Sequence, residues 1–186
     1  GDPAEADALL DHWRSWRPPT LDLFGPMPFT EVASISQDPV DPMPAAVTSE
    51  VLADLDDDAI ATIVDHTVPG DTPPLVIFSE ARRLGGAIGR GDSPAGERLR
   101  DAGYLLESVA IIPEPGLAPI VEGMMAALRE GLAGSSTGAA YLNFLEGEEK
   151  RTAGRAAMTE VAWARLRTVK ARLDPDDVMA HGLDLG

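Results

Sequence analysis

The sequence contains no cysteine, few basic residues and no long apolar run. Without cysteine, the chain excludes disulfides, zinc–thiolate sites, iron–sulfur clusters and cysteine nucleophiles. It has 15 Lys and Arg against 31 Asp and Glu, for a net charge of −16. That charge argues against binding to nucleic acid or to anionic membranes, because both need basic patches. No apolar run approaches the roughly 20 residues that cross a bilayer, so we expect a soluble protein.

The length and composition predict one folded domain over residues 1–186. A chain of 186 residues with 44% hydrophobic residues can bury a core and fits a single domain of ordinary size. The chain opens on Gly1-Asp2-Pro3, without a methionine or a targeting segment. We therefore expect a cytoplasmic protein whose true N-terminus lies upstream of this chain.

Charge is unevenly distributed along the chain. Residues 150–186 contain seven of the 15 basic residues but five of the 31 acidic residues, a local net charge of +2. The remainder of the chain carries −18. One interpretation is a helix with a basic solvated face, and the other is a tail that docks against an acidic surface.

Periodicity and breakers predict short strands mixed with helices. Apolar residues at helical spacing predict three main helices, over 4–16, 115–134 and 158–173. Asp56-Asp57-Asp58 predicts the start of another helix, and Ser49 is interpreted as the cap of a short one. The strand candidates are the segments 29–35, 75–79, 85–91, 104–112 and 139–145. Because strands and helices do not alternate strictly, the pattern predicts an α+β fold with a sheet covered by helices on one face.

Two segments resemble binding motifs but do not satisfy them. The acidic stretch 54–65 has Ala59 where a calcium loop needs glycine, and the three histidines lie far apart, so we expect no metal site. The glycine-rich segment 85–91 lacks the spacing of a phosphate-binding loop. An alternative is that Arg82, Arg83 and Arg90 contact an anionic ligand.

Tyr141-Leu142-Asn143-Phe144 is the most chemically suggestive cluster. On a strand, Tyr141 and Asn143 would share one face, while Leu142 and Phe144 would share the other. A face with a phenol and a carboxamide suits a sheet that contacts a ligand. The alternative is a half-exposed edge strand without such a role.

This cluster and the C-terminal helix together resemble the C-terminal signature of berberine-bridge-type FAD-linked oxidases. That signature is a Tyr-x-Asn-Phe strand followed by a helix with Arg-Leu and Lys before Tyr-Asp-Pro. It is matched here by Tyr141–Phe144 and by residues 163–179, in which Leu173 stands where the family usually has an aromatic residue. The segment 82–90 is similar to a strand of the substrate domain. The resemblance begins near Pro28 and implies a substrate-binding domain with an antiparallel sheet flanked by helices.

The resemblance also implies roles for individual residues and partners. Tyr141 would lie in the active site and assist proton removal, and Asn143 would lie close to the flavin ring. The C-terminal helix and tail, residues 154–186, would pack against an N-terminal FAD-binding domain that this chain lacks. FAD would belong to the complete enzyme, and this chain alone would bind no cofactor and be inactive.

Two functional hypotheses follow. In the first, the chain is the substrate-binding portion of an FAD-dependent oxidoreductase that oxidises a small alcohol, sugar or amine by hydride transfer to flavin. The alternative is a free-standing, non-catalytic binding or assembly module that kept the fold and lost the FAD domain. Under either hypothesis the surface facing the missing domain would be apolar, so we expect the isolated chain to self-associate or to be only marginally stable.

Overall fold

The computed structural model describes residues 2–36, 41–68, 70, 75–180 and 182–185. Their contacts divide the chain into two compact units, Gly1–Pro42 and Met43–Gly186. Among the described residues, no helix is both long and apolar enough to cross a membrane. The assignment of 1–186 to one substrate-binding domain stays a prediction.

In its described residues, 2–36 and 41–42, the first unit contains one α-helix and one 3₁₀ helix. Helix α1, Pro3–Trp16, begins where the Asp2 side chain accepts a hydrogen bond from the Ala4 N–H. The predicted strand over 29–35 is wrong, because Phe29–Ser34 forms the 3₁₀ helix η1. No described strand pairs with this segment, and local turns satisfy its backbone groups instead.

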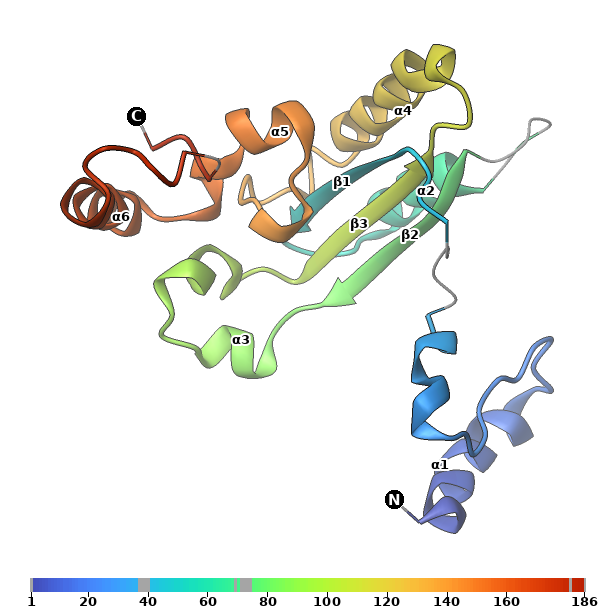
Figure 1. Ribbon diagram of the computed structural model, residues 1–186. Helices are drawn as coiled ribbons and strands as arrows, with labels where there is room; N and C mark the ends of the chain where they lie inside the picture. The colour runs from blue at the N-terminus through green and yellow to red at the C-terminus, as the bar shows by residue number, and fades with distance from the viewer. Residues whose placement is uncertain (1, 37–40, 69, 71–74, 181, 186) are drawn as a thin grey trace. The chain divides into compact units, whose positions relative to one another are not determined.

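The second unit is built on a three-stranded antiparallel sheet (Figure 1). Its strands are β1 (Ala45–Leu52), β2 (Val76–Arg83) and β3 (Tyr104–Ile111), in the spatial order β1-β3-β2. Both outer strands run antiparallel to β3. The α+β fold with an antiparallel sheet is therefore confirmed.

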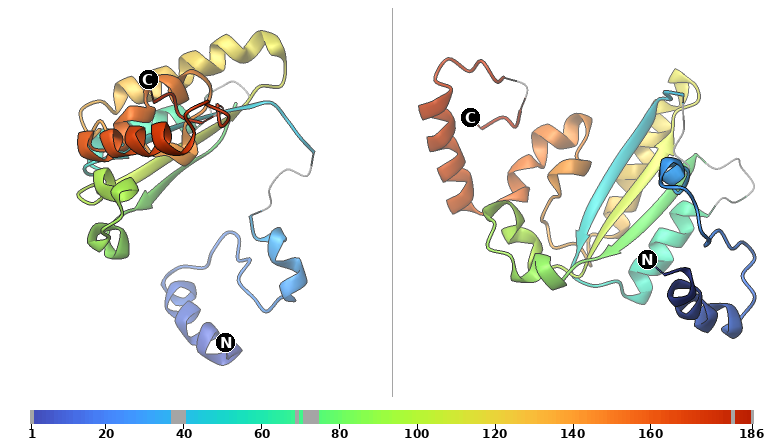
Figure 2. Two further views of the ribbon diagram at one scale, coloured as in Figure 1. Left: turned by 60° about the vertical axis from the view of Figure 1, so that its left-hand side comes forward. Right: turned by 60° about the horizontal axis from the view of Figure 1, so that its bottom comes forward.

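Two helices cover one face of this sheet (Figure 2). Helix α2, Asp57–Thr67, starts at Asp56, whose carboxylate caps the Ala59 N–H, and helix α4 spans Ala118–Gly131. The expected helices over these segments are confirmed. Side chains from both helices, β1 and β3 form two buried apolar clusters, which contain Leu52, Ala59, Leu106, Leu128 and Leu132, and Ala110, Val121 and Met125.

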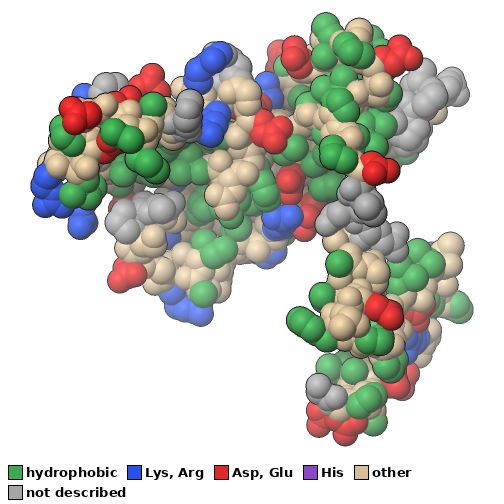
Figure 3. Space-filling view, viewed as in Figure 1, with side chains coloured by type: hydrophobic (Ala, Val, Ile, Leu, Met, Phe, Trp, Pro, Cys, Tyr) green, Lys and Arg blue, Asp and Glu red, His purple; other side chains and the backbone are tan. Residues whose placement is uncertain are grey.

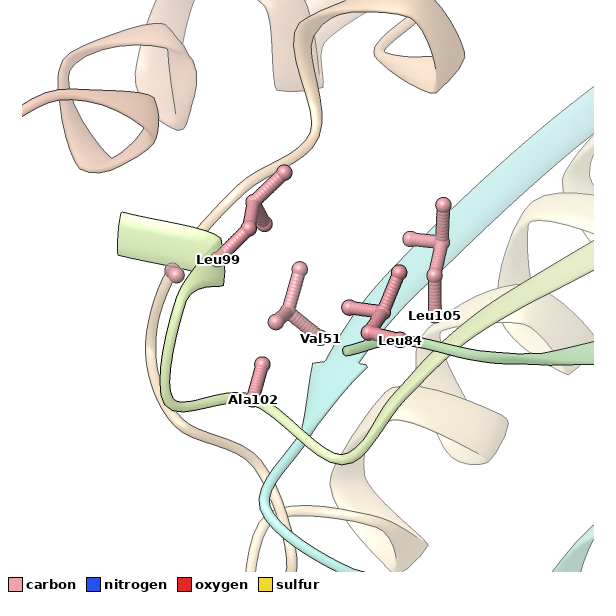
Figure 4. Close-up of a cluster of buried hydrophobic side chains, with 6 residues drawn as sticks. Val51, Leu84, Leu99, Ala102 and Leu105 are labelled. Atoms are coloured by element: carbon pink, nitrogen blue, oxygen red, sulfur yellow. The ribbon is translucent and has the colours of Figure 1, made fainter. Parts of the chain in front are cut away.

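Alternate residues of β3 point to the other face of the sheet. There Val51 and Leu105 join Leu84, Leu99, Ala102 and Ala139 in a third buried cluster at one end of the strands (Figure 4). Gly103 lies beside this cluster, and a Cβ there would approach the Ala53 carbonyl oxygen to 2.3 Å. This close approach requires glycine, and it lets the Gly103 N–H donate to the Leu52 carbonyl at 2.9 Å.

Three local predictions are wrong in this unit. Ser49 caps no helix, because it lies within β1, where pairing with β3 overrides local preference. The segment 85–91 is not extended, because Gly86–Arg90 forms the short helix α3 after Gly85 turns the chain at φ 130°. The strand predicted over 139–145 is also wrong, since Leu142–Phe144 forms the 3₁₀ helix η4.

The remaining elements connect and follow the sheet. Helix α6, Glu160–Leu173, begins at the Thr159 cap and confirms the predicted C-terminal helix. Figure 3 shows Lys and Arg side chains over the region of α5 and α6. Packing of residues 154–186 against an FAD domain stays a prediction. The shorter elements are η2 (Pro94–Leu99), η3 (Pro115–Leu117), α5 (Gly147–Thr152) and η5 (Gly154–Ala157).

The buried helix-facing side of β3 gives a stability prediction. Leu106 is 1% exposed and lies between β1, α2 and α4. Leu106→Ala should lower the free energy of unfolding by about 2–5 kcal/mol, because it removes buried methyl groups and leaves a cavity. Urea unfolding monitored by circular dichroism measures the change.

The matched control is Leu173→Ala, whose leucine is 69% exposed at the end of α6. It should change the free energy of unfolding by no more than about 0.5 kcal/mol. Equal losses from both variants would contradict the placement of the core.

Candidate functional site

Tyr141 and Phe144, rather than Tyr141 and Asn143, project together. Residue 141 precedes the turn η4, in which the Phe144 N–H donates to the Tyr141 carbonyl at 3.1 Å. In a 3₁₀ turn, side chains three residues apart lie above one another. The prediction that Tyr141 and Asn143 share a strand face is therefore wrong.

The two aromatic rings of η4 pack against each other and against the sheet. Their centroids lie 5.0 Å apart, with planes at 67°, an edge-to-face contact. Both rings pack on the third buried cluster, beside Val51 and Leu105. Asn143, which lies between these two residues in the turn, is exposed.

Three charged side chains lie on the same sheet face, next to these rings. Glu80 and Glu107 are register partners on β2 and β3. Arg82 donates two hydrogen bonds of 2.8 Å to Glu80 and one of 3.1 Å to Glu107. Its guanidinium also lies 5.0 Å from the centroid of the Phe144 ring. We call Tyr141, Phe144, Glu80, Arg82 and Glu107 the open-face site.

Burial gives the two carboxylates different titration properties. Glu107 is 9% exposed, and burial raises its pKa, an effect that Arg82 opposes and the neighbouring Glu80 adds to. Glu80 is exposed, and its hydrogen bonds from Arg82 lower its pKa. The site thus contains one carboxyl that retains a proton more readily than usual and one that loses it more readily.

A serine hydroxyl completes the row of polar groups across the sheet. Ser49 on β1 is the register partner of Glu107, on the side away from Glu80. Its Oγ is buried and has no hydrogen-bond partner among the residues described. A buried hydroxyl without a partner is costly, and at a site it marks a place for a further polar group.

A second polar cluster lies at the β1 edge, on the face toward α4. Arg129 donates to Thr48 Oγ1 at 2.7 Å and pairs with Glu149, which also accepts from Thr48 at 2.9 Å. Glu50 accepts from Ser136 at 2.8 Å, and burial raises its pKa. These bonds join β1 to α4, to α5 and to the chain before η4, so their evident role is structural.

The sequence did not identify Glu80, Glu107 or Ser49 as site residues, because they come together only through sheet register. One signal was present: Glu107, followed by Ser108, interrupts a mainly apolar strand candidate. The alternative of an anion site at the arginines is not supported at Arg82, which the two glutamates hold. Arg83 is also engaged, since it donates to the Gly103 carbonyl at 3.0 Å and lies over the Tyr104 ring.

The fold is similar to that of part of a berberine bridge enzyme-like protein. No protein-family model and no curated protein matches the sequence. Among solved structures, wild-type BBE-like 1 of Physcomitrella patens aligns with a TM-score of 0.60 at 17% identity. A point variant of that protein aligns with a TM-score of 0.59 at 18% identity. In both cases the alignment covers 76% of this chain and 30% of the other, so this chain spans under a third of their length.

The opposite pKa shifts of the two glutamates predict opposite pH dependences. A raised pKa means that the contribution of Glu107 to stability is fully present below its ordinary pKa and is lost as pH rises through the raised value. As pH rises from about 4 to about 7, the free energy of unfolding of the Glu107→Gln variant should therefore increase relative to that of the unmodified chain.

The Glu80→Gln variant is the matched comparison. Because the pKa of Glu80 is lowered, its contribution is present above its ordinary pKa and is lost as pH falls. This variant should therefore lose stability relative to the unmodified chain as pH rises toward the ordinary glutamate pKa of about 4.3, and the difference should stay constant above it. Denaturant unfolding at a series of pH values measures both slopes, and two slopes of the same sign would contradict the assignment.

Proposed function

We propose that this chain is the substrate-binding portion of an FAD-dependent oxidoreductase that oxidises a small organic substrate of the alcohol, sugar or amine type. The observation that carries the proposal is a phenol, Tyr141, beside ionisable groups on the sheet face that α2 and α4 leave free. The berberine bridge enzyme-like fold supports the same assignment.

Tyr141 is the proposed proton acceptor. A phenol can remove a proton from a substrate O–H or N–H only when a nearby positive charge stabilises its ionised form. Arg82 is the positive charge at this site: its guanidinium lies over the Phe144 ring that contacts Tyr141, and the glutamates hold it in place. Glu107, whose burial favours the protonated form, accepts a hydrogen bond from the same Arg82.

The open-face site is the proposed place for one side of the flavin ring. The exposed carboxamide of Asn143 has both a donor and an acceptor for the polar edge of the ring, and the aromatic pair beside it offers an apolar surface. When bound, FAD would supply the acceptor for the hydride that leaves the substrate carbon, while Tyr141 takes the proton. Asn143 is the proposed cofactor contact in this chain.

The dinucleotide part of FAD would be held by an FAD-binding domain outside this chain. A net charge of −16 disfavours binding of the pyrophosphate by this chain itself. The C-terminal segment 154–186, which has equal numbers of basic and acidic residues, is the proposed surface toward that domain, and Lys and Arg side chains in this region are visible in Figure 3. Self-association of the isolated chain through the same surface is part of the proposal.

The proposal is tested by expressing the longest coding region that contains this chain and recording its visible absorption spectrum. We expect a flavin spectrum, because the complete protein would hold FAD. A full-length product that remains free of flavin after FAD is added would overturn the proposal.

Tyr141→Phe tests the proton acceptor in that flavin-containing protein. Without the phenolic oxygen, the anaerobic rate of flavin reduction by an oxidisable substrate should fall about 10²- to 10⁴-fold, while flavin content is unchanged. The matched control is Tyr104→Phe, because Tyr104 lies on the helix-covered face of the sheet. An unchanged reduction rate in Tyr141→Phe would exclude the assigned role.

A further inference from the structure

Arg82 connects the charged row on the sheet to the turn that carries Tyr141. Three hydrogen bonds from two neighbouring strands fix its guanidinium, with Glu80 on β2 and Glu107 on β3. The group then lies 5.0 Å from the centroid of the Phe144 ring, which contacts the Tyr141 ring edge-to-face at the same distance. Contacts thus run without a break from Glu107 on β3 through Arg82 and Phe144 to Tyr141.

The position of η4 depends on side chains. The backbone before the turn is fixed to β1, where the Thr137 N–H donates to the Val51 carbonyl at 2.8 Å. It is fixed again where the Ala140 N–H donates to the Ala156 carbonyl at 3.2 Å. The turn itself is not a strand, and its aromatic rings pack against the sheet and the buried cluster below it. A cation over one of those rings therefore adds a directional contact to otherwise non-directional packing.

We propose that Arg82 is a positioning residue that holds the Phe144 ring, and through it the Tyr141 phenol, over the sheet because Glu80 and Glu107 fix its guanidinium plane. The proposal rests on the proposed function only in giving Tyr141 a catalytic role. The positioning itself is a property of this chain and can be measured without flavin or substrate.

The neighbouring arginine offers a matched control. Arg83 also lies over an aromatic ring, that of Tyr104 at 4.8 Å, but it is paired with the backbone carbonyl of Gly103 rather than with carboxylates. The chain contains two tyrosines, Tyr104 and Tyr141. Each arginine therefore has its own tyrosine reporter.

Fluorine NMR of the full chain labelled with 3-fluorotyrosine separates the two effects. Tyr104→Phe assigns the two resonances. Arg82→Met keeps an apolar stem but removes the guanidinium, and it should shift and broaden the Tyr141 resonance while the Tyr104 resonance stays unchanged. Arg83→Met should do the reverse. An unchanged Tyr141 resonance in Arg82→Met, or movement of both resonances in either variant, would overturn the proposal.

The conservative variant Arg82→Lys separates geometry from charge. A lysine retains a positive charge but lacks the planar fork that pairs with two carboxylates and stacks on a ring. The Tyr141 resonance should therefore remain displaced in Arg82→Lys. Restoration of the original resonance would show that charge alone is sufficient and would overturn the positioning role.

A pH series tests the link to Glu107. The charged and titratable groups around this carboxyl are Glu80 and Arg82 on β2 and, through Arg82, Tyr141 before η4, whereas β1 presents the uncharged Ser49. Protonation of Glu107 weakens its hold on Arg82, so the Tyr141 resonance should move with pH below neutrality. The same movement should be absent in Glu107→Gln. If the Tyr141 resonance still moves with pH in that variant, Glu107 does not help to fix the Arg82 guanidinium.

These results are separable from the proposed function. A Tyr141 resonance that does not move in Arg82→Met would refute positioning by Arg82 even if the flavin-containing protein is active. Conversely, a protein without flavin would refute the proposed function and leave the arginine-to-tyrosine coupling intact.

Discussion

The second unit depends on one strand, β3, which is hydrogen-bonded along both of its edges. Strand β1 pairs with it on one side and β2 on the other. The two outer strands do not pair with each other, so both depend on β3 for their place in the sheet. Because successive side chains of a strand point to opposite faces, β3 also organises two different surfaces. Leu106 and Ala110 face the covering helices, while Leu105 and Glu107 face the other way.

The composition of the open-face site follows from that alternation. A nearly buried carboxyl such as Glu107 is costly unless a partner compensates for its lost hydration. Arg82 is that partner, and its place on the adjacent strand follows directly from the sheet register. The same guanidinium lies over the Phe144 ring, which contacts Tyr141. The side chain that pairs with Glu107 therefore also contacts η4 on this face of the sheet. Charge compensation and the proposed active-site geometry thus share one side chain.

Much of this fold could be predicted from the sequence, because the strongest signals were long and periodic. Apolar spacing marked helices α4 and α6, and a bounded apolar run marked β3. The errors arose where tertiary contacts decide: Ser49 is in a strand only because β3 pairs with it, and Tyr141 precedes a turn because no strand is paired there. The motif around Tyr141 indicated the correct fold, but Glu107 as its neighbour required the register.

Hydrogen–deuterium exchange can test whether the sheet face opposite α2 and α4 meets the flavin, as we propose. The measurement compares the flavin-loaded form of the protein containing this chain with the form from which flavin has been removed. We expect flavin binding to slow exchange in β2 and in residues 139–145, with no change in α2 or α4. Protection of α2 and α4, with β2 and residues 139–145 unaffected, would show that the flavin meets the other face of the sheet.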